Sequence, residues 1–359
     1  METIRTRSFA RAGLLGNPSD GYFGKTLSFT FTQFGVDLML SESSRIRFLQ
    51  GEVDDATFGS MDELTRNLRL YGYYGGIRLL KATTKRFFDY CREHGVSLPQ
   101  RNFSVAYKIN IPRLVGLSGS SAICSAMLKA LMRFYEVAIP LEVQPTVCLE
   151  AERDELGINC GFQDRVIQFY NGLVFMDFNR DFVEAHNRGL YEELDPGCGG
   201  LNLYVAYDAN RAEESGKAHQ KVKRLFEAQN ADVLAAMSEF ADIARQGRDM
   251  LVAAQSGTAG ADWQTRFGEL VNANFDLRDR IFNVAEENRR MVMTARRSGA
   301  SAKFAGSGGA IVGTYADEEQ FRRLQADLAE IGSVAIRPTV ATRQDESAEF
   351  ANFGTWRNS

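Results

Sequence analysis

Histidine is scarce in this sequence. The 359 residues include three, His94, His186 and His219, and no two of them lie near each other. Histidine-based metal sites and Ser-His-Asp catalysis therefore have few residues to use. The five cysteines are odd in number, widely spaced and never arranged as Cys-x-x-Cys, which argues against a disulfide framework or a structural zinc site. We expect any general acid or base to be a carboxylate or a lysine.

Long apolar segments are also missing. No run approaches the length that spans a bilayer, and the N-terminus lacks the basic and then apolar layout of a secretion signal. A net charge of -4 gives no indication of nucleic acid or an anionic membrane surface as a partner. We therefore expect a cytoplasmic protein that binds neither nucleic acid nor a membrane.

The length exceeds what one hydrophobic core comfortably supports, so we expect two domains. Turn residues gather at 194–200, and a new strand pattern follows them. We place the boundary there, with an N-terminal domain over 1–195 and a C-terminal domain over 196–359. The order of elements in the second half predicts an open α+β sandwich covered by helices on one face.

The hydrophobic periodicity predicts the individual elements. In the first half we expect a glycine-bearing turn over 11–24, strands over 27–34, 36–40, 103–111 and 172–178, and helices over 75–91, 149–155 and after residue 122. In the second half we expect strands over 201–206, within 303–313 and over 334–339, and helices over 217–254, 263–299 and around 321–331. An exposed loop is expected over 255–261, and the polar tail after Arg343 is expected to be mobile.

The segment Ile111-Pro-Arg-Leu-Val-Gly-Leu-Ser-Gly-Ser-Ser-Ala122 is a glycine- and serine-rich loop that leads into an amphipathic helical pattern. Gly116 and Gly119 let backbone N–H groups approach an anion closely, and three serines add hydroxyl donors. The helix that follows points its positive dipole end into the loop. A phosphate cradle and a plain helix N-cap use the same small residues, so the loop alone leaves both interpretations open.

Two more glycine-rich segments lie far from this loop, at 13–20 and 303–310. With three such segments in this order, the chain resembles the GHMP kinases, the family of galactokinase, homoserine kinase and mevalonate kinase. Within that family it is most similar to the glucuronokinase branch. The segments that carry this similarity are Arg11-Ala-Gly-Leu-Leu-Gly-Asn-Pro-Ser-Asp20, Gly72-Tyr-Tyr-Gly-Gly-Ile-Arg-Leu-Leu80, Asn110 to Ala122, and Leu156-Gly-Ile-Asn-Cys-Gly-Phe-Gln-Asp-Arg165.

The resemblance implies a fold and an activity. The fold would be α+β, with an N-terminal domain of the ribosomal-S5-domain-2-like type and a ferredoxin-like C-terminal domain that carries extra helices. The activity would be ATP- and Mg²⁺-dependent phosphorylation of the anomeric hydroxyl of a free sugar, with D-glucuronate as the expected substrate, in a monomer or homodimer. Galacturonate, arabinose or a heptose phosphate are alternative substrates, and a catalytically silent sugar-binding regulator is an alternative role.

The resemblance also assigns roles to charged residues. Asp164 would face the substrate hydroxyl, and Glu152 would bind Mg²⁺ together with Ser121 or Ser120. A hard cation needs such oxygens, and the attacking hydroxyl must lose a proton. Arg11 would keep Asp164 ionised and neutralise the transferring phosphoryl group. Without the family motifs, Glu152 would be read as part of an exposed helix face and Asp164 as a helix cap.

The remaining assignments concern the nucleotide and the sugar. The nucleotide phosphates would lie against Gly116, Leu117, Ser118, Gly119, Ser120, Ser121 and Ala122 and against Gly306, Ser307 and Gly308. The sugar would contact Asn17, Ser19, Asp20 and Gln163. Asn17 and Pro18 replace the usual glutamate and histidine of galactokinases, which argues against galactose. The cation for a uronate carboxylate stays open among Lys25, Arg78, Arg113 and Lys217, and Tyr71, Tyr73 and Tyr74 could stack on a ligand or pack in the core.

Overall fold

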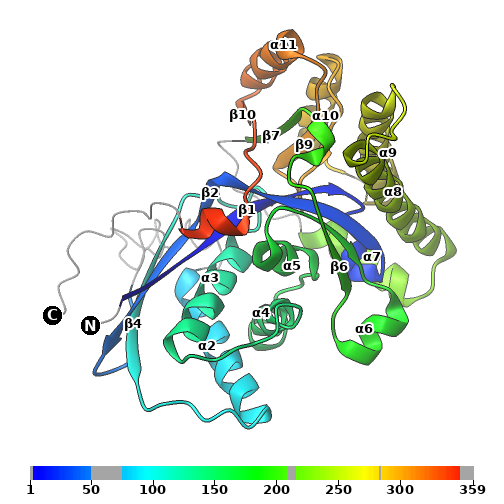
Figure 1. Ribbon diagram of the computed structural model, residues 1–359. Coiled ribbons are helices and arrows are strands. Elements are labelled where there is room, and N and C mark those ends of the chain that lie inside the picture. Colours follow the sequence, from blue (N-terminus) through cyan, green and yellow to red (C-terminus); the bar gives the residue numbers. More distant parts are fainter. Residues whose placement is uncertain (1–2, 50–74, 209–215, 283, 348–359) are drawn as a thin grey trace, which may run out of the picture.

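The computed structural model describes residues 3–49, 75–208, 216–282 and 284–347 (Figure 1). These residues form two β-sheets with helices packed against them. The first sheet contains β1 (Thr3–Leu15), β2 (Lys25–Ser43), β3 (Arg47–Phe48), β4 (Asn102–Ile109), β5 (Leu173–Asp177) and β6 (Leu190–Leu194). The second contains β7 (Leu203–Asp208), β8 (Lys303–Phe304), β9 (Ala310–Thr314) and β10 (Ser333–Ile336), in the order β10-β7-β9-β8.

The first sheet is built on a long hairpin of β1 and β2. Along its other edge, the first part of β2 pairs with β5 and its last part pairs with β4, and all these pairs are antiparallel. The prediction of two strands, 27–34 and 36–40, is wrong, because the chain forms one strand. Phe9 pairs with Gly35 and the next residue, Ala10, pairs with Phe31, so residues 32–34 form a bulge that interrupts the alternating pattern.

The predicted turn over 11–24 begins later than expected. Residues 10–15 are all buried, and β1 continues through them to Leu15. The turn itself spans 16–24 and contains the short helix η1 (Ser19–Tyr22). As a result, Arg11 extends from a buried strand instead of from the turn.

Helices of the first half lie together on one side of the β1–β2 hairpin (Figure 1). They are α2 (Gly76–Glu93), α3 (Gly119–Phe134), α4 (Gln144–Glu150), the π-helical turn η2 (Ala151–Glu155) and α5 (Gln163–Tyr170), followed by α6 (Arg180–His186) near β6. The predicted helices over 75–91 and after residue 122 and the strands over 103–111 and 172–178 are confirmed within a few residues. The predicted helix over 149–155 is split between the end of α4 and η2.

The second half carries α7 (Gly216–Glu227), α8 (Ala231–Gln255), α9 (Trp263–Phe282), α10 (Glu286–Arg297) and α11 (Glu318–Ala329), with short turns η3 (Cys198–Gly200) and η4 (Arg343–Ser347). Both long helical patterns are broken in two. Gln229 adopts a left-handed φ of 56°, and the Asn230 side chain caps α8 by accepting a hydrogen bond from the Val233 N–H. No helix in the described ranges is both long and apolar enough to cross a membrane.

The boundary between the two hydrophobic clusters does not coincide with the point where the chain passes from the first sheet to the second. The apolar cluster beneath the first sheet continues into α8 and α9, for example at Phe240, Leu251 and Phe267, whereas α10, α11 and the second sheet enclose a smaller cluster. The sheets change between β6 and β7, near residue 195, but the division into domains stays a prediction.

The C-terminal tail returns to the first half, since Glu346 of η4 accepts a hydrogen bond from Lys129 Nζ at 2.6 Å. Residues 343–347 are therefore ordered, and residues 348–359 lie outside the described part.

Candidate active site

A cleft of about 1080 Å³ lies where the three glycine-rich segments meet. Its walls come from the 16–24 turn, the 111–120 loop, the 157–165 segment, the end of α7 and the third loop at 306–307. These segments are far apart in the sequence, so the fold alone brings them together. Both sheets contribute, because β1 precedes the first segment and β8 precedes the third.

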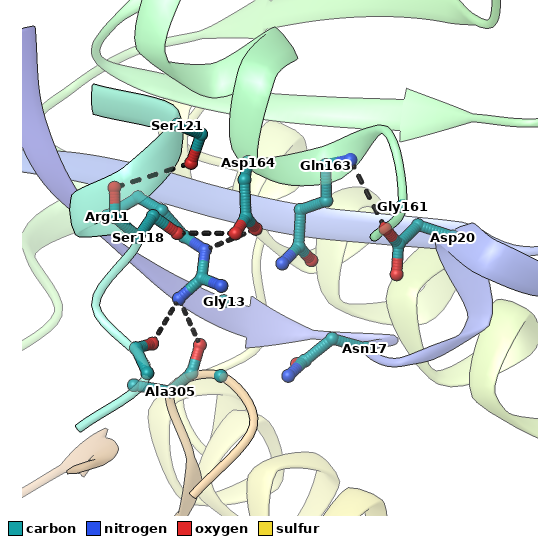
Figure 2. A network of polar contacts seen from close by, with 12 residues as sticks. Arg11, Gly13, Asn17, Asp20, Ser118, Ser121, Gly161, Gln163, Asp164 and Ala305 are labelled. Carbon is teal, nitrogen blue, oxygen red and sulfur yellow. Dashed lines mark hydrogen bonds and ion pairs between the residues drawn. The ribbon is translucent and has the colours of Figure 1, made fainter. Parts of the chain in front are cut away.

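Arg11 connects three of these segments (Figure 2). Its Nε donates a hydrogen bond to Asp164 Oδ1 at 2.7 Å, and its Nη1 donates to the carbonyl oxygens of Gly116 at 2.6 Å and Ala305 at 3.0 Å. The Ser118 hydroxyl donates to the other Asp164 oxygen at 2.6 Å. Asp164 is thereby fixed at the cleft wall by one arginine and one loop serine.

These contacts determine the charge state of Asp164. Burial favours its neutral form, but the charges of Arg11 and Arg165, together with hydrogen bonds from Arg11 and Ser118, outweigh burial and lower the pKa of Asp164 to about 2. The carboxylate is therefore ionised at any physiological pH. Its role as a helix cap is wrong, because both of its oxygens receive side-chain donors.

The 111–122 loop and the 303–310 loop touch each other at their glycines. Gly116 has a φ of 76°, and a Cβ there would lie 2.9 Å from the Ser307 nitrogen. A Cβ on Gly306 would collide with the Gly116 carbonyl oxygen. Only glycine permits this approach of two backbones, and Gly116, Gly306 and Ser307 all line the cleft. Leu117, Ser118, Gly119 and Ser120 also line the cleft, whereas Ala122 and Gly308 do not.

Asp20 and Gln163 line the cleft beside Asp164 (Figure 2). Asp20 Oδ2 accepts a hydrogen bond from the Gln163 backbone N–H at 3.2 Å. Burial and the nearby charge of Asp164 raise the pKa of Asp20 to about 6, although that hydrogen bond and two arginines oppose the rise. The side-chain oxygen of Gln163 is buried without a hydrogen-bond partner in the described residues. Both groups can therefore take ligand hydroxyls.

Asn17 and Ser19 are placed differently. Asn17 lines the cleft, and its side-chain oxygen accepts a hydrogen bond from Lys303 Nζ, which also donates to the Gly13 carbonyl at 2.5 Å. Burial lowers the pKa of Lys303 well below its usual value. Ser19 is fully buried, and its hydroxyl donates to the Lys25 carbonyl at 2.9 Å, so it shapes the turn and does not line the cleft.

Glu152 and Ser121 lie behind the cleft wall. Glu152 is completely buried, so its interpretation as part of an exposed face is wrong. Its Oε2 accepts a hydrogen bond from Arg165 Nε at 2.7 Å, while Oε1 has no hydrogen-bond partner in the described part of the chain. The Ser121 hydroxyl donates to the Ser118 carbonyl at 3.3 Å. Of the two serines left open for the metal, only Ser120 lines the cleft.

The candidate cations for a uronate carboxylate differ in whether they line the cleft. Lys25 forms an ion pair with Asp177, and neither it nor Arg78 lines the cleft, whereas Arg113 does. The side chain of Lys217 and residues Tyr71, Tyr73 and Tyr74 lie outside the described part.

Comparison with known proteins identifies the family. The model of the GHMP kinase N-terminal domain matches residues 78–172. Glucuronokinase 1 of Arabidopsis thaliana is 42% identical over 315 residues, which cover 86% of this chain and 84% of that protein. This chain belongs to the GHMP kinase family. A second Arabidopsis thaliana protein, named probable glucuronokinase 2, is 43% identical over 85% of this chain and 82% of its own length.

Solved GHMP kinases share the fold. Galactokinase from Lactococcus lactis, solved with galactose, superposes with a TM-score of 0.71 at 14% identity and covers 95% of this chain and 94% of its own. Mevalonate kinase from Methanococcus jannaschii gives a TM-score of 0.65 at 15% identity, over 94% and 98% of the two chains. The expected GHMP kinase fold is therefore confirmed.

Three residues of this GHMP kinase site escaped sequence analysis. Gln168, fully buried on α5, donates from Nε2 to the Ser118 carbonyl at 3.0 Å, and its spacing of four from Asp164 was the available signal. Arg165 pairs with Glu152. Arg278 donates to the carbonyls of the third loop, to Gly306 at 2.7 Å and Ser307 at 3.2 Å, and nothing in its helical surroundings indicated this.

Proposed function

We propose that this GHMP kinase transfers the γ-phosphoryl group of ATP to the anomeric hydroxyl of D-glucuronate, which yields D-glucuronate 1-phosphate. The observation that carries the proposal is Asp164, held ionised between Arg11 and Ser118 at the wall of a cleft lined by two glycine-rich loops. The substrate follows from the two glucuronokinase relatives, which align along most of this chain.

In this proposal Asp164 orients the sugar hydroxyl and accepts its proton. A carboxylate with a pKa of about 2 is a weak base, so it would receive the proton only after the bond to phosphorus has largely formed. Phosphoryl transfer depends mainly on positioning and on stabilisation of charge, and this demand suits a weakly basic, firmly held aspartate. Arg11 would place a positive charge beside the transferring group.

The nucleotide phosphates would lie along the 111–122 loop and the 303–310 loop. Backbone N–H groups at the start of α3 and the Ser120 hydroxyl are available at the cleft, whereas the Ser118 hydroxyl already donates to Asp164. Gln168 and Arg278 hold the carbonyl groups of the two loops, which would leave the N–H groups free to face the nucleotide. Ser121 and Ala122 would support the helix start from behind.

Mg²⁺ would be bound by Glu152 and a loop serine, Ser120 or Ser121. The donor types suit this ion, because Glu152 Oε1 is a carboxylate oxygen without a partner in the described residues. Their positions differ, since Ser120 lines the cleft whereas Glu152 and Ser121 are buried behind its wall. Mg²⁺ usually takes one or two carboxylates and completes its shell with phosphate and water. When bound, the ion would neutralise charge on the phosphate oxygens.

The sugar would lie between Asp164 and the 16–24 turn, in contact with Asn17, Asp20 and Gln163. Its other hydroxyls can donate to Asp20, which accepts more strongly when it is ionised. Ser19 would act indirectly, by holding the turn that carries Asp20.

Replacement of Asp164 by asparagine tests the proposal. We expect turnover to fall roughly 100- to 10,000-fold, because the amide keeps the shape but cannot accept a proton. ATP affinity, measured by titration calorimetry, should stay within about twofold. Asp262→Asn, an exposed position outside the cleft, is the control. Unchanged turnover in Asp164→Asn would contradict the assignment.

The substrate is tested by ADP release with a panel of free sugars. D-glucuronate should give the largest kcat/KM, ahead of D-galacturonate, L-arabinose, D-galactose and a heptose phosphate. A larger value for another sugar would replace glucuronate in the proposal. Sugar binding without ADP release from any of them would indicate a regulator instead of an enzyme.

A further inference from the structure

Six cationic side chains of the described residues line the cleft: Arg11, Arg113, Arg153, Arg165, Lys223 and Arg224. Three of them are neutralised by carboxylates. Arg11 pairs with Asp164 at 2.7 Å, Arg153 pairs with Asp154 at 2.6 Å, and Arg165 pairs with Glu152. Arg113 lies near the start of the 111–122 loop, whose glycines and serines are assigned to the nucleotide phosphates.

Lys223 and Arg224 differ from the others. Both are exposed, both belong to the last turns of α7, and neither forms an ion pair with another residue of the described ranges. The helix that carries them is firmly attached. Val222 is buried, and the ring of Phe226 packs edge-on against Tyr22 with 5.0 Å between centroids. These two cations therefore stand at a fixed wall of the cleft.

A chain of contacts links this wall to Asp164. The backbone of Gln163, next to Asp164, donates to Asp20, and Asp20 shares η1 with Tyr22, which packs against α7. A sugar whose C1 hydroxyl faces Asp164 would extend along this path. In a hexuronate the carboxylate is attached at C5, on the opposite side of the ring oxygen from C1. With the ring extended along this path, the carboxylate can face α7.

The charged residues between Asp164 and α7 also favour placement of the uronate carboxylate beside α7. Asp20 and Glu227 are the carboxylates that line the cleft near α7, and the two cations balance them. A neutral sugar needs no such cations, whereas a uronate carboxylate is recognised best by a guanidinium group or an ammonium group. We propose that Lys223 and Arg224 bind the carboxylate of the uronic acid and so select it over neutral sugars. This inference rests on the proposed function.

The test uses the full-length enzyme and the variants Lys223→Gln, Arg224→Gln and the double variant. For D-glucuronate we expect kcat/KM of the double variant to fall about 10- to 100-fold, mainly through KM, because a charge-assisted hydrogen bond is lost at each position. Arg224→Gln should have the larger single effect, since an arginine can form two parallel hydrogen bonds with a carboxylate. Activity on D-glucose or D-galactose and the KM for ATP should stay within about twofold.

A matched control is the double variant Arg322→Gln/Arg323→Gln, two adjacent exposed cations on α11 outside the cleft, which should leave every parameter unchanged. Glu227→Gln should lower the KM for D-glucuronate about twofold, because it removes a negative charge beside the pair. An equal loss on neutral sugars, an increase confined to the KM for ATP, or no loss at all would each overturn the assignment. A wild-type enzyme that is inactive on D-glucuronate would overturn the proposed function as well. Because this measurement uses the wild type alone, its failure can be told apart from a failure of the variants.

Discussion

Two arginine–carboxylate pairs meet at the start of α5 and differ in their surroundings. Arg11 and Asp164 form the pair at the cleft, where the Asp164 side chain is 22% exposed. Arg165 and Glu152 form the pair behind it, where the Glu152 side chain is 0% exposed. Each arginine also donates to backbone carbonyl groups, Arg11 to two loops and Arg165 to Gly161 at 2.8 Å. The same chemical contact therefore occurs once with access to solvent and once without it.

This difference in exposure separates Asp164, which can react with a ligand, from Glu152, whose pair with Arg165 is structural and is called the brace below. A carboxylate at a cleft can exchange a protein partner for a ligand or for water, whereas a carboxylate in the interior depends on its partner. Asp164 and Arg165 are consecutive residues, so the brace also acts on the site. The charge of Arg165 contributes to the low pKa of Asp164. The buried pair thus supports the exposed pair both mechanically and electrostatically.

Removal of the buried arginine should have the largest effect on stability. We expect Arg165→Met to lower the free energy of unfolding by about 3–5 kcal/mol, because it leaves Glu152 charged and unpaired in the interior. Arg11→Met should lower it less, since water in the cleft can solvate Asp164. Urea unfolding measures both values. The double variant Glu152→Gln/Arg165→Met should recover part of the loss, and equal losses in the two single variants would end the distinction between the pairs.

Removal of the cleft arginine should change the pH dependence of activity. The folded pKa of Asp164, about 2, lies below the unfolded value, so its pairing stabilises the fold above about pH 4 and is lost as the pH falls through 2. Without Arg11 the effect of burial dominates and the pKa rises. We expect Arg11→Met to lower kcat about 100-fold and to introduce, in the pH profile of kcat, an acid limb between pH 4 and 6 that kcat of the wild type lacks.

The control for this measurement is Arg7→Met on the same strand. Arg7 pairs with Asp37 at 2.5 Å, away from the cleft, so its loss should leave the shape of the pH profile unchanged. A flat profile in Arg11→Met would show that Arg11 does not keep Asp164 ionised.

Local patterns predicted most of the fold. The helix after the 111–122 loop follows from its apolar spacing, and the cleft loops follow from their glycines. The errors in the predicted strands and helices have local physical causes that the hydrophobic periodicity of the sequence does not reveal. The bulge at 32–34 keeps one strand continuous, and the left-handed Gln229 interrupts a helix whose apolar pattern continues on both sides.

The site was predictable only in part. The assignment of Arg11 and Asp164 came from the family resemblance, because their contact spans 153 residues and no local pattern encodes it. Arg165 looked like an ordinary helix residue, and its pairing with Glu152 depends on how η2 and α5 pack. Lys223 and Arg224 lie in a generally charged helix and were not singled out. Such residues acquire a role only when the tertiary structure shows which side chains share a cavity.

A third carboxyl group, Asp20, extends the comparison because it faces the same cleft without forming an ion pair in the described residues. Burial and Asp164 raise its pKa to about 6, above the unfolded value, so its ionisation destabilises the fold increasingly between pH 4 and 6 and fully above that range. We expect Asp20→Asn to raise the free energy of unfolding by about 1–2 kcal/mol at pH 8, with no gain at pH 4. The same variant should raise the KM for the sugar and remove its dependence on pH near 6. An equal gain in the free energy of unfolding at pH 4 and pH 8 would mean that the charge of Asp20 does not cause the destabilisation. Asp20 would then differ from Asp164 in packing alone.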